Sequence, residues 1–308
     1  MLVMEEVKRR YVVTELEHWN DISMFPPRFL SAFVFRGQGN YDWHIKSSLE
    51  RMVERFHPVG EVQRRIYPAG YEHDMLKEFQ WKYPKYEKLN IPREDEIIEW
   101  LSIMQHYGCP TRMVDFSYSP YVALFMAIDS AEGLNPSAVW CLNKLVLGMK
   151  YNQEYKLKTE KSFDSMDEEN SQIYEDANLM LNDYIQERRK DYTPYIYLLQ
   201  PHRVNERILQ QQGLFAVPEK IDVSFEDNLF SLVDNREPEE VSFKEIIDYS
   251  NSEKMFRPYD YFLIKIKIPH NFRLDITKAL YQMNISSETM YPGLEGLARS
   301  LNRQHYTG

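Results

Sequence analysis

The order of apolar and polar residues along the chain predicts a mixture of strands and helices. Short apolar runs typical of buried strands occur at residues 32–36, 137–142, 195–199 and 213–217. Residues 261–268 alternate apolar side chains with two lysines, which predicts a strand with one exposed face. Helices are predicted at residues 72–81, 94–107, 119–131, 172–189, 272–283 and 290–302. This mixture favours an α+β fold, with a mixed sheet as the core and helices flanking it.

Two segments look different from this core pattern. Residues 150–170 are rich in lysine, acidic residues, serine and asparagine, and they contain few large apolar groups. Such a composition is typical of an exposed insertion or linker, and with the helix predicted after it we expect a largely helical insertion near residues 150–190. We expect residues 1–30 to form an N-terminal helical extension. The stretch 219–235 has no clear pattern.

The charge balance narrows the classes of partner. The 308 residues carry 47 Asp and Glu against 37 Lys and Arg, a formal net charge of −10. An acidic chain has no overall attraction for phosphate backbones or anionic lipids, although a local basic groove is compatible with this sum. The longest apolar run, Val122 to Ile128, is far shorter than the roughly 20 residues of a spanning helix. Together with the charged N-terminus, this short run predicts a cytoplasmic protein that does not bind membranes. The acidic net charge predicts that it does not bind nucleic acids.

Metal and thiol chemistry find little support in the sequence. The two cysteines, Cys109 and Cys141, lack the spacing of a metal or redox motif, and no two histidines have metal-ligand spacing. We therefore expect no metal site, and we expect Cys109 to pack in a turn before Pro110.

Three polar clusters follow predicted elements, at residues 35–38, 105–117 and 207–215. The second is the densest and offers the mixed donors and acceptors that a polar ligand needs. A structural alternative is that Arg112 and Asp115 pair with each other and that His106 only caps its helix. At the first cluster, Arg36 ends a strand beside Gly37. This arrangement predicts a bidentate grip on phosphate, with the glycine leaving room for the ligand.

Five short motifs follow one another along the chain. Phe-Arg-Gly-Gln at 35–38 is followed by Ser-Leu-Glu-Arg at 48–51, Gln-His-Tyr-Gly-Cys-Pro-Thr-Arg at 105–112, Gln-Gly-Leu-Phe at 212–215 and Tyr-Pro-Gly-Leu-Glu-Gly-Leu at 291–297. In this order they closely resemble the FRG domain family, which is named for the first tripeptide. The chain departs from the family at Lys46, where proline is common, and at Gly293, where an acidic residue is common. The resemblance implies one FRG domain over residues 31–303, interrupted by the insertion.

A weaker resemblance is to the ADP-ribosyltransferases. An Arg-Gly at the end of a first core strand, a stretch from Thr111 to Ala127 that runs into a helix, and a late Gln-Gln-Gln step into a strand follow their three-part layout. The resemblance implies an ADP-ribosyltransferase-like fold with NAD as substrate. With this resemblance we expect NAD contacts at these residues: Arg36 for phosphate, with Gly37 and Gln38 beside it, Thr111, Arg112 and Ser117 for ribose or phosphate, and His106 and Tyr107 for ring or ribose.

The last residue of that layout does not match, because glutamine stands where those enzymes have glutamate. Cleavage of the N-glycosidic bond develops positive charge, which a nearby anion stabilises. Gln210 or Gln212 is the candidate at the late position, with Gln212 preferred, and Asp115 or Glu295 is the candidate anion.

Three functions remain open from the sequence. The first is NAD cleavage or ADP-ribosyl transfer, for instance in bacterial defence or as a toxin, to an acceptor that the sequence does not identify. The second is a non-catalytic ligand-sensing or interaction module, which the missing glutamate favours. The third is a nucleic-acid-processing enzyme, against which the acidic balance counts.

Overall fold

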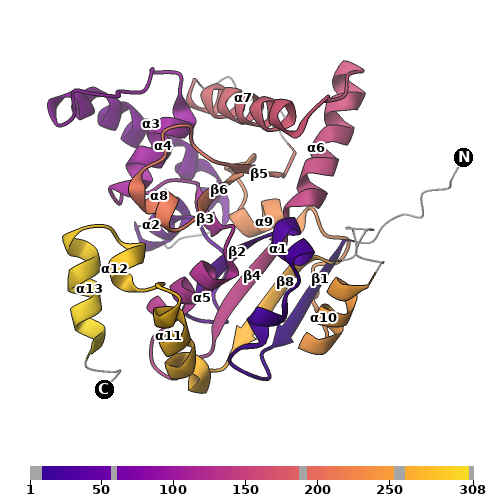
Figure 1. The fold of residues 1–308 in the computed structure, drawn as a ribbon. Coiled ribbons are helices and arrows are strands. Elements are labelled where there is room, and N and C mark those ends of the chain that lie inside the picture. Colours follow the sequence, from indigo (N-terminus) through magenta and orange to yellow (C-terminus); the bar gives the residue numbers. More distant parts are fainter. Residues whose placement is uncertain (1–8, 57–60, 187–192, 253–260, 305–308) are drawn as a thin grey trace, which may run out of the picture.

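An eight-stranded mixed sheet forms the centre of the protein in a computed structural model, which describes residues 9–56, 61–186, 193–252 and 261–304 (Figure 1). The strands are β1 (Arg10–Glu15), β2 (Phe33–Gln38), β3 (Val114–Ser117), β4 (Ser137–Asn143), β5 (Ile196–Leu199), β6 (Gly213–Pro218), β7 (Glu239–Glu240) and β8 (Tyr261–Ile268). Their order is β5-β6-β3-β2-β4-β8-β1-β7. Pairing is antiparallel from β5 to β8, whereas β1 runs parallel to both β8 and β7. The α+β prediction is confirmed.

Helices cover both faces of this sheet. They are α1 (Pro27–Ala32), α2 (Ser48–Phe56), α3 (Glu61–Lys82), α4 (Ile97–His106), α5 (Pro120–Asp129), α6 (Lys144–Thr159), α7 (Met166–Ile185), α8 (Glu206–Gln210), α9 (Phe225–Phe230), α10 (Phe243–Asn251), α11 (Arg273–Gln282), α12 (Ser287–Met290) and α13 (Leu294–Gln304), with single 3₁₀ turns at Asp21–Met24, Tyr83–Lys85 and His270–Phe272. No helix in the described ranges is both long and apolar enough to cross a membrane.

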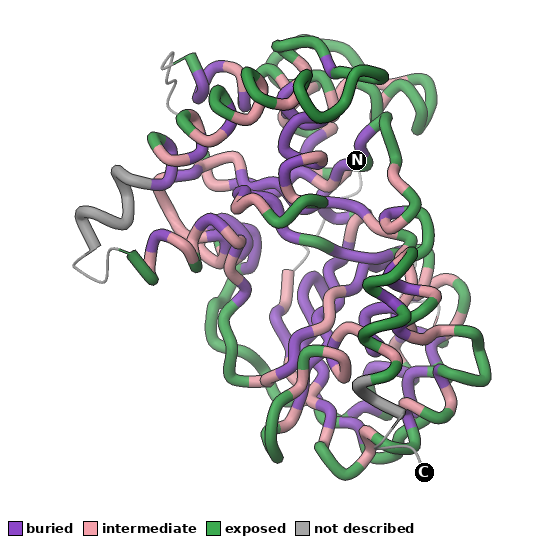
Figure 2. The backbone as a smooth tube through the Cα atoms, turned by 90° about the vertical axis from the view of Figure 1, so that its left-hand side faces the viewer, coloured by how far each residue is buried: buried purple, intermediate pink, exposed green. Residues whose placement is uncertain are grey.

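Two hydrophobic cores result, one on each face of the sheet. Trp140 and Leu142 of β4 join the core beneath α3, α4, α6 and α7, whereas Val139 and Cys141 join the core beneath α5, α10 and α11. This division follows from the strand geometry, because successive side chains point to opposite faces. Figure 2 shows the buried segments in purple running through the middle of the molecule between exposed helices.

Burial on both faces corrects the expectation for residues 261–268. Strand β8 is almost entirely buried, and even Lys265 is only 9% exposed. Its ammonium group lies 4.6 Å from the ring centre of Trp140 and 4.3 Å from that of Tyr41. The aliphatic part of a lysine can be buried while its ammonium group faces aromatic rings. The alternation of apolar residues with lysine therefore did not indicate a solvent-exposed face.

The insertion near residues 150–190 is helical as predicted, and residues 152–170 are mostly exposed. Helix α6 covers much of residues 150–170 and buries Val146, Leu147 and Tyr151 in the first core. Helix α7 begins at Met166, ahead of the predicted start, because the Ser165 hydroxyl caps it. It buries Met180 and Leu181 in the same core. The end of the predicted helix, beyond residue 186, lies outside the described residues.

The N-terminal segment 1–30 also differs from expectation. Residues 1–8 lie outside the described residues, and β1 follows as a strand that pairs with β8 in place of a helix. Helical turns come only after it, in the 3₁₀ turn at Asp21–Met24 and in α1. The partner strand of β1 lies some 250 positions later in the chain, which is why a local pattern did not reveal it.

Close packing against helix α5 and the residue that follows it explains Gly37 of the first motif and Gly39 just after that motif. A Cβ atom at Gly37 would lie 2.0 Å from the carbonyl oxygen of Ala123 and 2.4 Å from the amide nitrogen of Ala127. Gly39 is similarly crowded, at 1.9 Å from the carbonyl oxygen of Ser130. Gly37 therefore makes room for helix α5, and the expectation that it makes room for a ligand is corrected.

Candidate functional site

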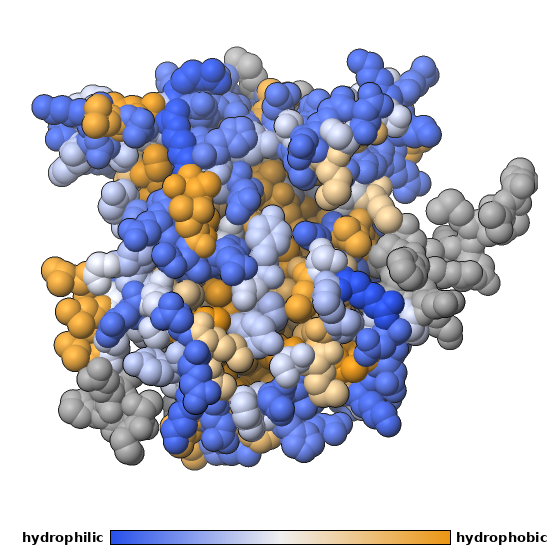
Figure 3. Space-filling view, in the orientation of Figure 1, coloured by the Kyte–Doolittle hydropathy of each residue, from blue (hydrophilic) through white to orange (hydrophobic). Residues whose placement is uncertain are grey.

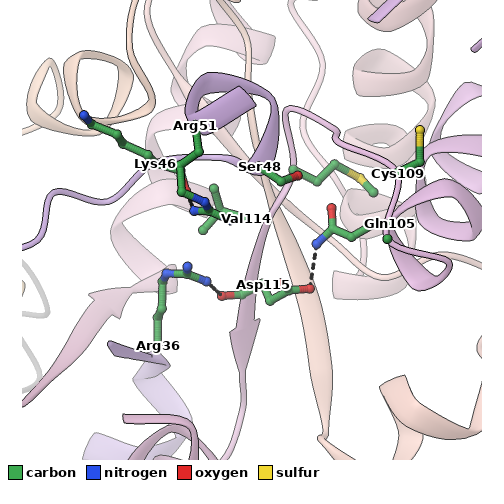
Figure 4. A pocket seen from close by; sticks show the side chains of 10 residues that line it. Arg36, Lys46, Ser48, Arg51, Gln105, Cys109, Val114 and Asp115 are labelled. Carbon is green, nitrogen blue, oxygen red and sulfur yellow. Dashed lines mark hydrogen bonds between the residues drawn. The ribbon is translucent and has the colours of Figure 1, made fainter. Parts of the chain in front are cut away.

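A small polar cavity lies where β2 and β3 meet the start of α2 and the end of α4 (Figure 4). We call it the polar cup. Its volume is about 120 Å³, and it is lined by Arg36, Lys46, Ser48, Arg51, Gln105, Gly108, Cys109, Met113, Val114 and Asp115. Three of these residues are cationic and one is a carboxylate, so the lining carries net positive charge in an otherwise acidic chain.

Arg36 forms one side of the polar cup. Its Nη1 atom donates a hydrogen bond to the backbone carbonyl oxygen of Asp115 at 2.7 Å. Its Nε atom is buried and has no hydrogen-bond partner, and the guanidinium forms no ion pair within the described part of the chain. Burial lowers the pKa of Arg36 to about 10, so it keeps its charge at neutral pH. A partly buried guanidinium with an unpaired Nε donor suits an anionic ligand.

Arg51 supplies a second guanidinium from α2. Its Nη1 atom donates to the carbonyl oxygen of Lys46 at 2.6 Å, and Arg51 also lacks a carboxylate partner among the described residues. In Figure 4 the side chains of Arg36 and Arg51 approach the same space from opposite sides, whereas Lys46 extends away. Lys46 is accordingly held by Glu54, with 2.7 Å between Nζ and Oε1.

A chain of hydrogen bonds holds the opposite wall of the polar cup. Gln105 Nε2 donates to Asp115 Oδ1 at 2.8 Å, and the Thr111 hydroxyl donates to Gln105 Oε1. The Thr111 backbone nitrogen donates to the Ser48 hydroxyl at 3.0 Å. Thr111 is fully buried, so it positions Gln105 and Ser48 from behind and does not line the cup as a predicted ligand contact would.

Arg112 lies elsewhere. It is buried, its Nε atom donates to Glu72 Oε2 at 2.7 Å, and its backbone nitrogen donates to Glu72 Oε1 at 3.1 Å. Its guanidinium also lies 5.0 Å from the ring centre of Tyr184. The structure therefore places Arg112 in a core ion pair with Glu72, which corrects both the predicted ligand contact and the alternative pairing with Asp115.

Gln38 and Ser117 are likewise occupied inside the protein. Gln38 accepts a hydrogen bond from Trp140 Nε1 at 2.6 Å and donates to the His44 carbonyl oxygen at 3.1 Å. The Ser117 hydroxyl donates to the Gln211 carbonyl oxygen at 2.7 Å. Both side chains are buried and connect neighbouring segments. They therefore stabilise the fold, and the predicted ligand contacts at these two residues are corrected.

The remaining candidates sit outside the polar cup. Gln212 is an exposed residue in a left-handed turn with φ of 45°. Glu295 pairs with Arg299 at 2.9 Å on α13. His106 lies at the end of α4 and its pKa is lowered. Partial desolvation is the main cause and the charge of Arg207 the second, whereas Glu295 acts in the opposite direction. Asp115 is thus the one predicted catalytic residue that lines the cup.

Tyr107 lines a neighbouring cavity, which it shares with Cys109. The polar residues of the lining to which the sequence analysis assigned no ligand contact are Lys46, Ser48, Arg51 and Gln105. Ser48 and Arg51 belong to the Ser-Leu-Glu-Arg motif, which was the available signal, although nothing local places that helix beside β2.

Comparison with known proteins identifies part of the chain. The model of the FRG domain family matches residues 31–135 of this α+β protein. Every residue that lines the polar cup falls within the matched range. No curated protein and no solved structure matches the chain, so the ADP-ribosyltransferase resemblance gains no support from these comparisons. The motifs at 212–215 and 291–297 lie outside the match, and the extent 31–303 stays a prediction.

Proposed function

We propose that the polar cup binds the phosphate groups of a nucleotide, with NAD as the candidate ligand. The observation that carries this proposal is the pair of guanidinium groups, Arg36 and Arg51, which face one small cavity and have no carboxylate partner among the described residues. Arginine matches phosphate oxygens with two parallel hydrogen bonds. The Ser48 hydroxyl and the Gln105 amide add polar groups on the lining.

NAD cleavage or ADP-ribosyl transfer is the reaction that we propose for this site. The bond between C1′ and the nicotinamide nitrogen breaks, nicotinamide leaves with the electron pair, and water or an acceptor adds to C1′ and gives up its proton. Asp115 is the carboxylate that can stabilise the positive charge on the ribose. Gln105 holds its Oδ1 atom, and Oδ2 makes no hydrogen bond within the described chain.

Binding without turnover is the second candidate. Glu295 and Gln212 both lie outside the polar cup, so the lining contains a single carboxylate, and Asp115 is an exposed residue that water can screen. A ligand-sensing module with the same cup would hold a nucleotide and leave it intact.

Calorimetric titration with ADP-ribose tests whether the guanidinium groups of the polar cup bind phosphate. An Arg51→Ala variant is expected to bind about tenfold more weakly, because a charge-assisted hydrogen bond contributes roughly 1.5 to 3 kcal/mol. Arg55→Ala is the matched control: Arg55 lies one turn further along α2 and does not line the polar cup. Equal affinities in the two variants would contradict the assigned role of Arg51.

Release of nicotinamide from NAD separates the two candidates. An Asp115→Asn variant is expected to release nicotinamide about 100-fold more slowly, because it removes the anion near the developing charge. Its NAD affinity should not fall, since the cup loses a negative charge. Asp74→Asn, at an exposed position outside the cup, serves as control. A wild-type protein that binds NAD and releases no nicotinamide would favour the sensing module.

A further inference from the structure

A second, larger cavity adjoins the polar cup. Its volume is about 510 Å³, and four aromatic side chains line it: Phe79, Tyr83, Tyr86 and Tyr107. We call it the aromatic cavity. Cys109 lines both hollows, and the turn at the end of α4 divides them, with Tyr107 on the aromatic side and Gly108 on the polar side. The two cavities therefore lie on either side of one short turn.

The inner wall of the aromatic cavity is fixed by the core. Tyr83 packs edge-on against Trp100 with 5.3 Å between ring centres, and Phe79 does so at 6.3 Å. Trp100 is only 2% exposed, and its Nε1 atom donates to the Arg93 carbonyl oxygen at 2.8 Å. The inner rings are therefore held in place before any ligand arrives.

The outer wall is open. Tyr107 is 71% exposed and Tyr86 is 86% exposed, a large apolar area to leave in water. Figure 3 shows that the visible face is mostly hydrophilic, with hydrophobic residues gathered in the recesses between helices and along α13. Exposed tyrosines opposite a fixed aromatic wall are suited to hold a planar ring between them.

The charged residues of the aromatic cavity are held by contacts within the protein. Glu78 pairs with Lys82, and Glu87 Oε1 accepts hydrogen bonds from the backbone nitrogens of Lys88 at 2.8 Å and Leu89 at 2.9 Å. The aromatic cavity thus offers aromatic surface and a small negative charge, whereas the polar cup carries net positive charge and has no aromatic side chain in its lining. A nucleotide has this same division between its base ring and its phosphates.

We propose that the aromatic cavity binds the base ring of the nucleotide whose phosphates lie in the polar cup, with the ring stacked against Tyr83 and Tyr107. This inference rests on the proposed phosphate site. It adds that the ligand is recognised at two ends, so that a free phosphate compound binds more weakly than a nucleotide.

Calorimetric titrations with ADP and with inorganic pyrophosphate test the two ends separately. The wild-type protein is expected to bind ADP at least tenfold more tightly than pyrophosphate. Tyr107→Ala should weaken ADP binding roughly tenfold and leave pyrophosphate binding unchanged, as alanine substitution at a stacking position does elsewhere. Tyr281→Ala is the matched control, because Tyr281 on α11 is 74% exposed and lines a different cavity.

The outcomes are distinguishable. If ADP and pyrophosphate bind equally tightly, or if Tyr107→Ala weakens both by the same factor, the base site is overturned and the phosphate site stands. If neither compound binds the folded wild-type protein, both proposals are overturned.

Discussion

A Glu72→Gln variant is expected to lose about 3 to 5 kcal/mol of unfolding free energy, the cost of leaving one charge of a buried ion pair without its partner. Glu72 is fully buried, and its two carboxylate oxygens accept hydrogen bonds from the Nε atom and the backbone nitrogen of Arg112. Chemical denaturation followed by circular dichroism measures the loss.

Glu94→Gln is the matched control for that loss. Glu94 pairs with Lys77 of α3 at 2.7 Å, but its side chain is 79% exposed, so the change should cost less than about 1 kcal/mol. Similar costs for the two variants would contradict the buried pair. A Glu72→Leu, Arg112→Met double variant should regain much of the stability and still bind ADP-ribose. A folded double variant that no longer binds would restore Arg112 to the ligand site.

An Arg36→Ala variant is expected to bind ADP-ribose at least 100-fold more weakly than the wild type. The effect exceeds that at Arg51 because Arg36 is partly buried whereas Arg51 is exposed, and electrostatic interactions are stronger away from water. Titration calorimetry measures the affinity, and thermal unfolding checks that the variant remains folded.

Arg36→Lys separates charge from geometry at the same position. Lysine keeps the positive charge but not the planar fork that meets two phosphate oxygens, so it should recover only part of the lost affinity. An Arg36→Ala protein that is folded and binds as tightly as wild type would show that this residue is not the phosphate grip.

The local sequence pattern predicted an element correctly where the structure buries the apolar residues of that element as the pattern implied. The apolar run at 137–142 became β4, which is buried along its whole length. Residues 150–170 are mostly exposed as predicted, but the helix α6 that begins ahead of them was missed. It buries apolar residues at its start and pairs Tyr151 with Asp176 at 2.8 Å. Strand β1 was missed because its partner is distant in sequence.

The candidate site was predicted only in part, for a related reason. Arg36 and Asp115 stood out because they belong to polar clusters after a predicted strand and a predicted helix, and they do line one cavity. Gln105 and Arg51 enter the polar cup only through the packing of α4 and α2 beside the sheet, which no local pattern encodes. The sequence also could not distinguish a glycine that admits a ligand from Gly37, which admits helix α5.

A crystal structure of the protein with ADP bound is the most direct test of the central claim. The two-ended site predicts a phosphate within hydrogen-bond distance of the guanidinium groups of Arg36 and Arg51, and the adenine ring between Tyr83 and Tyr107. Nucleotide density at any other place on the protein, with the polar cup empty, would contradict the account.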